Sequence, residues 1–252
     1  AVVHMYLRKH LWMVALLALT YTTAAQGQGV ERAMVTDRSP RHWTLELQFG
    51  SYFPSIDRGV SGTPFEDVFG GGNLLTQLAL QRYVYEGIGT LGIGLQVGYS
   101  EFFGRAFLQD SNVRSGDSSS LHVIPIQLFA AYRFDYAAIH WDIPFAVYGK
   151  AGIGEWIWWS DDGDGETAGN GDASGAKLGF SVSAGAAFHL DWLDPRLARE
   201  FDRNFGVNNS YIFVEYTRWN AKFRGNLFKH GIEARGLDLS DEIVSGGIAF
   251  EF

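Results

Sequence analysis

Apolar and polar residues alternate along most of the chain from residue 43 onward. In Trp43–Phe49 every odd position is apolar and every even position is polar, which is the pattern of a strand with two unlike faces. In Leu91–Ser100 large aliphatic residues share one face, and glycine, glutamine and serine share the other. The pattern predicts eight strands, the other six within residues 74–85, 120–134, 141–159, 178–190, 211–223 and 239–252. With their ends left open by a few residues, the strands reach the length of about nine to eleven residues that a tilted strand needs to cross a bilayer.

The second strand changes phase near Gln81 and Arg82, which predicts a β-bulge there. The connections alternate between long and short, as in an up-and-down barrel of the outer membrane, whose turns are short on the periplasmic side. The long ones are residues 54–73, 104–119, 160–176 and 224–238, and the short ones are 86–87 and 135–140.

One connection on the periplasmic side, residues 191–208, is long and has a helical pattern. Asp194 can cap a helix, Pro195 suits its first turn, and Gly206 can end it. Apolar side chains recur every four residues at Leu197, Phe201 and Phe205. A helix here could plug the inner mouth, lie on the inner leaflet or pack as a cap over the rim, and we favour the cap.

Residue size indicates which face of each strand looks outward. A soluble barrel covers its exterior with solvated charges, whereas the face of strand 91–100 that carries Gly92, Gly94 and Gln96 fits only a narrow lumen. The bulky face therefore faces lipid. Aromatic residues, which gather at membrane interfaces, are expected at both ends of the outward face: Trp43, Tyr83, Tyr132, Phe134, Trp141, Phe188, Phe250 and Phe252 at the periplasmic end, and Phe53, Tyr99, Phe102, Trp159, Trp219 and Phe223 at the external end.

The pattern of residues 43–252 resembles that of the small outer-membrane β-barrels, such as the OmpA transmembrane domain and OmpX. The final residues Ile248–Phe252 form an alternating strand that ends in phenylalanine. This ending resembles the signal that the barrel-assembly machinery reads, which would make Phe250 and Phe252 the assembly signal. The resemblance implies an all-β, eight-stranded transmembrane barrel.

The first residues are typical of an export signal. Arg8 and Lys9 precede a short apolar run, Leu11–Leu19, and small residues follow it. The run is too short for a spanning helix, which needs about 20 residues. We predict a signal peptide at residues 1–25, with a cut after Gly27 as the alternative. A flexible periplasmic leader is expected at 26–41, and the barrel at 42–252.

The composition of the chain excludes several classes of protein and of site. Apolar residues make up 46% of the chain and aromatic residues 15%, yet the mean hydropathy is −0.05, unlike that of a helical membrane protein. The absence of cysteine excludes disulfides, thiolate metal sites and a lipidated cysteine anchor. A net charge of −8 argues against a nucleic-acid partner. No cofactor is implied.

Every second residue of a strand points into the barrel. Counted in this way, six residues with polar side chains point inward and predict a polar network in the lumen. A charge in so narrow a space requires a partner, so we expect Lys150 to pair with one or more of the carboxylates. A structural role is favoured, with a narrow gated ion path as the alternative. The predicted members are Glu46, Tyr148, Lys150, His189, Glu215 and Glu251.

Two external connections carry candidate ligands. The acidic residues Asp162, Asp164 and Glu166 have the spacing that opens a calcium loop but lack its distal glutamate, so a solvated surface loop is favoured over a metal site. Cations on or near the last long connection could neutralise lipopolysaccharide phosphates or simply keep the loop soluble. They are Arg218, Lys222, Arg224, Lys229 and Arg235.

A nucleophilic hydrolase that modifies outer-leaflet lipids is the enzymatic alternative. Ser120 and His122 share the outward face of one strand, and Glu101 lies on the neighbouring strand with the same parity. In a nucleophilic hydrolase the serine would be the nucleophile, the histidine the base and the glutamate the acid that orients the histidine. Their order, Ser-x-His, differs from the His-x-Ser of the lipid A deacylases.

We therefore expect a non-enzymatic barrel in the outer membrane that serves envelope integrity or surface contact through its external loops. Its partners would be membrane lipid, lipopolysaccharide and, during biogenesis, the assembly machinery. The alternatives are the lipid-modifying hydrolase, the gated channel and a soluble periplasmic barrel that binds an apolar ligand.

Overall fold

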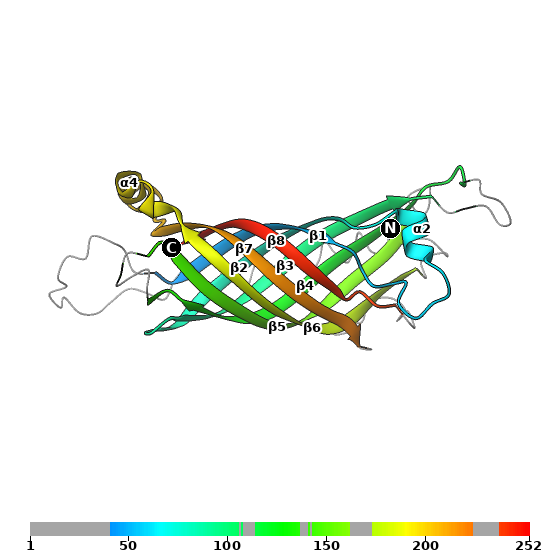
Figure 1. Cartoon of the computed structure of the whole chain (residues 1–252), viewed down its shortest axis with the longest axis horizontal. Helices are drawn as coiled ribbons and strands as arrows, with labels where there is room; N and C mark the ends of the chain where they lie inside the picture. Colours follow the sequence, from blue (N-terminus) through cyan, green and yellow to red (C-terminus); the bar gives the residue numbers. More distant parts are fainter. Residues whose placement is uncertain are drawn as a thin grey trace, which may run out of the picture. The chain divides into compact units, whose positions relative to one another are not determined.

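A computed structural model describes residues 41–105, 107, 114–136, 141, 143–161, 173–223 and 237–252. Eight antiparallel strands form a closed barrel in which each pairs with its neighbours in sequence and the last pairs with the first (Figure 1). The strands are β1 (Trp43–Tyr52), β2 (Asn73–Glu86), β3 (Thr90–Gly104), β4 (Ser119–Phe134), β5 (Phe145–Asp161), β6 (Ser174–His189), β7 (Asn209–Phe223) and β8 (Asp241–Glu251). The predicted fold class is confirmed. The expected signal peptide and all of the leader except Arg41 lie outside the described residues.

The two faces of the strands differ in exposure as the alternation predicts. On β1, Thr44, Glu46 and Gln48 are buried in the lumen, while Phe49 is exposed on the outside. Along β2 the alternation holds through Tyr83, and the register shift lies between Tyr83 and Tyr85. The bulge therefore falls closer to the turn than predicted. Gln81 is still buried and Arg82 still exposed, as the alternation along the strand requires.

Aliphatic side chains form a belt around the middle of the exterior. Cross-strand neighbours Leu78 and Val97 are both exposed, as are Val214 and Val244 on the side where the barrel closes. The lumen face opposite them carries glycine, glutamine, serine and threonine. An exposed apolar band of this extent marks contact with lipid rather than water. No helix among the described residues is long and apolar enough to cross a membrane.

Three aromatic residues expected in the lipid-facing girdles point inward instead. Tyr83, Phe102 and Trp219 are 8%, 1% and 2% exposed. Trp219 shares the inward parity of Glu215 with no break between them. These rings fill the lumen near its two mouths, where the outward assignment of the sequence analysis was wrong.

A short helix that the sequence analysis did not predict lies in the first external connection. Helix α2 (Pro64–Phe69) begins at a proline, and Asp57 accepts hydrogen bonds from the N–H groups of Phe65 and Glu66. It packs closely on β3 because Gly104 has no side chain: a Cβ there would lie 2.1 Å from the Val68 carbonyl oxygen. The helix delivers Phe65 into the barrel's outer mouth.

Helix α4 (Pro195–Phe205) follows the 3₁₀ turn η2 (Leu190–Trp192) at the opposite end of the barrel. The Asp194 side chain accepts hydrogen bonds from the N–H groups of Arg196 and Leu197, and Gly206 ends the helix at φ 70°. The helix itself is as predicted, but none of its residues is buried. The interpretation of α4 as a packed cap over the rim is therefore wrong.

An arginine in the aliphatic belt tests whether lipid surrounds the barrel. We predict that Leu78→Arg lowers the free energy of unfolding in lipid vesicles by about 2–4 kcal/mol, the cost of a charge near the bilayer midplane. Val60→Arg is the matched control, since Val60 is an exposed apolar residue in an external connection. Its effect should stay within about 0.5 kcal/mol. Equal, small effects in a denaturant titration would mean that the belt faces water.

Candidate functional site

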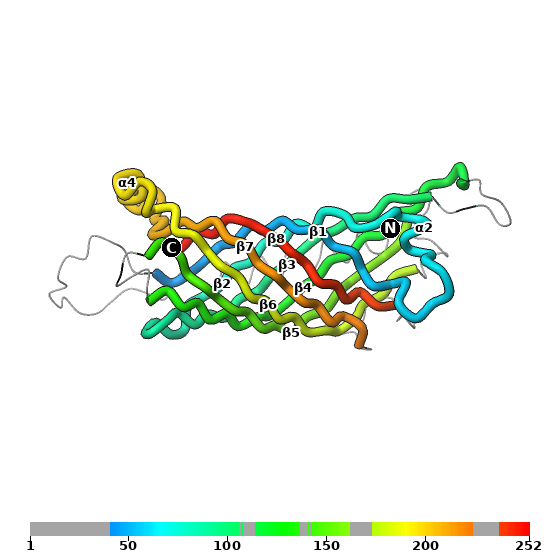
Figure 2. The backbone as a smooth tube through the Cα atoms, in the orientation of Figure 1, coloured from blue at the N-terminus to red at the C-terminus, as the bar shows by residue number. Residues whose placement is uncertain are grey.

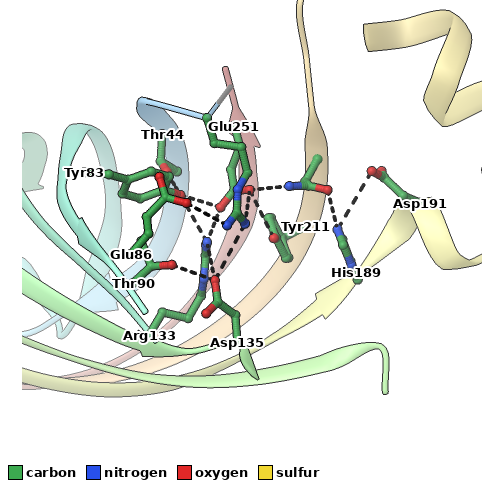
Figure 3. A network of polar contacts seen from close by, with 12 residues as sticks. Thr44, Tyr83, Glu86, Thr90, Arg133, Asp135, His189, Asp191, Tyr211 and Glu251 are labelled. Atoms are coloured by element: carbon green, nitrogen blue, oxygen red, sulfur yellow. Dashed lines mark hydrogen bonds and ion pairs between the residues drawn. The ribbon is translucent and has the colours of Figure 1, made fainter. Parts of the chain in front are cut away.

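The periplasmic end of the lumen holds a cluster of charged side chains around Glu251, which is fully buried on β8 (Figure 3). Its carboxylate pairs with Arg133 of β4 and accepts a hydrogen bond from the Tyr83 hydroxyl. Asn209 donates from Nδ2 at 2.5 Å and Tyr211 from its hydroxyl at 3.2 Å. The last strand is thus tied to β4, which lies four strands away on the opposite wall.

Two arginines balance the carboxylates of this periplasmic cluster. Arg133 lies 3.4 Å from Asp135, and its guanidinium carbon lies 4.9 Å from the ring centroid of Tyr211. Arg41, just before β1, lies 3.6 Å from Glu251, 3.7 Å from Asp135 and 3.0 Å from Glu86. Charges taken out of water in this way need both opposite charge and hydrogen bonds, and the cluster supplies both.

His189 lies at the rim of the same cluster. Its ring stacks on Tyr211 with the centroids 4.6 Å apart, and Nε2 lies 3.0 Å from Oδ1 of Asn209. Asn209 in turn donates to Glu251, so two of the predicted lumen residues, His189 and Glu251, meet through one amide.

The middle of the lumen holds a second cluster around Lys150 of β5. The Lys150 ammonium lies 2.6 Å from Glu46 on β1 and 2.9 Å from Glu215 on β7. Glu215 also accepts hydrogen bonds from Gln48 at 3.2 Å and Thr217 at 2.8 Å. This lysine cluster brings together the other four predicted lumen residues, since the Tyr148 ring centroid lies 5.2 Å from Lys150 Nζ.

Two aromatic rings also lie near the cation of the lysine cluster. Lys150 Nζ lies 5.5 Å from the ring centroid of Phe129 and 5.7 Å from that of Phe213. A cation held over ring faces gains electrostatic stabilisation, more so when water is excluded. The cluster therefore occupies the barrel's cross-section with paired charge and rings.

The external third of the lumen is filled by apolar residues, which we call the aromatic plug. Trp219 contacts Tyr52 and Trp156 with ring centroids 5.3 and 5.4 Å apart, and Phe65 of α2 contacts Phe102 at 5.2 Å. The Tyr52 hydroxyl donates to the Leu239 carbonyl at 2.8 Å. The plug consists of Tyr52, Phe65, Leu75, Phe102, Leu121, Val123, Trp156, Trp158, Trp219, Ala221, Leu239 and Ile243.

The sequence analysis missed the two arginines, the two tyrosines and Asp135 of the periplasmic cluster. Arg133 has the inward parity of its strand, but that inward face is mostly apolar, with Val123 and Phe129 on either side of Gln127, so little polar contrast marks it. Parity counted strictly from His122, which lies outward, would have found it. Arg41 lies in the expected leader and Asp135 in a turn, where parity has no meaning.

A polar cluster also lies on the outside of the barrel near its external rim. The structure brings together Ser120, His122 and Glu101: Ser120 Oγ lies 3.1 Å from His122 Nε2, and Glu101 Oε1 lies 3.5 Å from Nδ1. The His122 ring is stacked on Trp159 with centroids 4.8 Å apart, and the Tyr99 hydroxyl lies 2.9 Å from Nδ1. His122 is only 9% exposed as a result.

Asp161, which the sequence analysis did not consider, changes the chemistry of this outer cluster. Its Oδ2 lies 3.2 Å from the same Nε2 that contacts Ser120. A nitrogen that donates its proton to Asp161 cannot accept the proton of Ser120, as a general base must. The ring thus lies between two carboxylates, an arrangement that fits a structural contact better than a hydrolytic triad.

The remaining candidates lie partly outside the described residues. Arg218 and Lys222 are exposed at the external end of β7, where Arg218 Nε lies 3.7 Å from Glu242. They line a recess of about 270 Å³ together with Arg58, Ser240 and Asp241. The other predicted cations, Arg224, Lys229 and Arg235, and the acidic residues Asp162, Asp164 and Glu166, lie outside the described residues.

The last strand ends at the seam of the barrel. The backbone N–H groups of His42 and Trp43 donate to the Phe252 carbonyl, and Phe252 donates to Trp43. Phe250 and Phe252 are less buried than Ala249 and Glu251, which point into the lumen.

A closed eight-stranded barrel with an apolar exterior belt and inward-facing polar clusters has the architecture of a small transmembrane β-barrel. No family model matches the chain, and no curated protein matches it. Solved structures do. Neisserial surface protein A is 12% identical with a TM-score of 0.43, over 83% of this chain and 97% of that one.

Two further structures are similar. Ail, the attachment invasion locus protein of Yersinia pestis, crystallised with the heparin analogue sucrose octasulfate, is 11% identical with a TM-score of 0.41, over 85% of this chain and 100% of that one. The outer membrane protein OprG from Pseudomonas aeruginosa is 16% identical with a TM-score of 0.43, over 85% and 97%. At these identities the likeness is one of fold.

Removing the cation of the lysine cluster tests its structural role. We predict that Lys150→Met lowers the free energy of unfolding by about 3–5 kcal/mol, because Glu46 and Glu215 are left buried without a counter-charge. The triple variant Lys150→Met, Glu46→Gln, Glu215→Gln should regain most of this loss, since no buried charge remains. Urea unfolding in lipid vesicles, followed by tryptophan fluorescence, measures both. A single variant as stable as wild type would contradict the pairing.

A lipid profile tests the outer cluster for hydrolysis. Because Asp161 competes for Nε2, we expect cells that express wild type and His122→Ala to contain the same outer-membrane lipids by mass spectrometry. Ser120→Ala serves as the second variant, since it removes the nucleophile but leaves the ion pairs. A lipid species that changes by the same mass in both variants would establish the hydrolase.

Proposed function

We propose that the protein is a non-enzymatic, integral outer-membrane barrel that serves envelope integrity or surface contact through its external connections. The observation that carries this proposal is the combination of an aliphatic exterior with a lumen that side chains fill at three levels. Residues 1–25 would direct export, and Phe250 and Phe252 would be read by the assembly machinery.

The filled lumen favours this function over a gated ion path. An eight-stranded barrel is just wide enough for side chains to fill. An ion would have to pass the periplasmic cluster, the lysine cluster and the aromatic plug in turn. The two charged clusters join opposite walls, so opening them would require breaking buried ion pairs. Opening the plug would require separating packed rings.

The cations at the external end support contact with lipopolysaccharide. Arg58, Arg218 and Lys222 line one recess beside the aliphatic belt. Guanidinium and ammonium groups bind phosphate by charge-assisted hydrogen bonds. Asp241 and Glu242 share the recess, which suits a phosphate brought together with its bound divalent cation.

Conductance measurements test the sealed lumen. We expect planar bilayers that contain the folded wild-type barrel to show no single-channel events, and Lys150→Ala to be equally silent because the aromatic plug remains. Steps that appear in wild type and change in Lys150→Ala would replace this proposal with the channel.

Lipopolysaccharide contact has its own test. The double variant Arg218→Gln, Lys222→Gln should purify from the outer membrane with less bound lipopolysaccharide than wild type, and added salt should lower the wild-type value. Arg82→Gln is a control from the opposite end of the exposed surface. Equal amounts in all three proteins would mean that these cations only keep the rim soluble.

A further inference from the structure

The periplasmic end carries an exposed apolar surface built from η2 and α4. It consists of Trp192, Leu193, Leu197, Phe201 and Phe205, which are 36–68% exposed. Phe201 and Phe205 contact each other with ring centroids 5.1 Å apart, so the surface is continuous along the helix. A continuous exposed apolar patch that is bordered by polar residues marks a binding surface.

The opposite face of α4 is polar and charged, with three arginines flanked by Glu200 and Asp202. At 100° per residue, Leu197, Phe201 and Phe205 lie on one side of the helix, and Arg196, Arg199 and Arg203 lie on the other. Such a division, aromatic and aliphatic residues against arginines, is typical of a helix that lies in a membrane interface. A helix that only closed a barrel mouth would bury its apolar face, and α4 does not.

The ends of α4 are held by the barrel. Before the helix, Asp191 accepts a hydrogen bond from the Ser210 N–H at 3.2 Å. After it, Val207 and Asn208 are buried, and the Asn208 N–H donates to the Glu251 carbonyl at 2.7 Å. These contacts give the helix a defined position on the rim.

That position is beside the wall and not across the mouth. In Figures 1 and 2 the strands run across the picture, while α4 is seen almost end-on, beyond the outline of the barrel at the end where β8 finishes. The helix therefore runs crosswise to the barrel's long axis, as an element parallel to a membrane surface would.

The apolar surface is also continuous with the outward face of the barrel. Trp192 contacts Phe188 of β6 with centroids 6.4 Å apart, and Phe188 contacts Phe145 of β5 at 5.0 Å. Phe145 is exposed on the lipid-facing side. The aromatic girdle thus extends to Trp192 of η2, the element that leads into α4.

We propose that α4 is an interfacial anchor whose apolar face inserts into the phospholipids of the inner leaflet. This proposal rests on the outer-membrane placement proposed above. The three arginines lie at headgroup height and reach lipid phosphates with their long side chains. The alternative inner-leaflet position named in the sequence analysis is thereby preferred to a plug or a cap.

Site-specific quenching tests the anchor, and the chain suits it because it has no native cysteine. Single cysteines carrying an environment-sensitive fluorophore are placed by Phe201→Cys on the apolar face and Arg199→Cys on the charged face. Leu78→Cys reports the barrel belt, and Val60→Cys reports an external, aqueous position. Each folded protein is inserted into vesicles of phosphatidylethanolamine and phosphatidylglycerol with quenchers on the acyl chains.

We expect the Phe201 label to be quenched several-fold more than the Arg199 label and nearly as much as the Leu78 label. Quenching at Leu78 with none at Phe201 would overturn the anchor and leave the membrane placement intact. No quenching at Leu78 would instead overturn the proposed function itself. If excess unlabelled protein reduced the quenching of the Phe201 label, a second copy of the chain would be covering the helix. This result would also contradict the proposal.

Discussion

The structure depends on pairing charge across a space too narrow for water to screen it. Strands β1 and β5, and β4 and β8, lie opposite each other in the closed barrel, and an ion pair joins each couple: Lys150 with Glu46, and Arg133 with Glu251. Because a buried charge without its partner is costly, each pair favours the closed arrangement over any opened or slipped one. The same residues that favour closure also occupy the lumen.

The apolar exterior and the polar clusters inside the barrel have one common cause. In this barrel the apolar side chains face outward and the polar ones inward, the reverse of a soluble protein. With lipid outside, the apolar side chains of the strands are satisfied by the bilayer, and the polar ones must satisfy one another inside. The exception is the external mouth, where Tyr52, Phe102 and Trp219 turn inward and α2 adds Phe65. There rings pack against one another in place of a polar network. Helix α4 extends the lipid-facing surface at the other mouth.

The outer cluster illustrates how neighbours decide chemistry. Ser120, His122 and Glu101 are close enough for a nucleophilic triad, but Asp161 takes the nitrogen that would activate the serine. Stacking between Tyr99 and Trp159 further covers the ring. The His122 ring, in contact with Glu101 and Asp161, links β3, β4 and β5 near the external rim.

The sequence by itself determined the eight strands, their inward and outward faces and helix α4, because a period of two and the capping residues Asp194 and Gly206 are local properties. It also placed Glu46, Lys150, Glu215 and Glu251 in the lumen by parity. Only the tertiary structure decided which charges meet, since register and closure bring Arg41, Arg133 and Asp135 to Glu251, so that three separate segments of the chain meet. It alone placed Trp219 inside and α4 outside, because each depends on how much space the closed barrel leaves at its mouths, and no local pattern records that space.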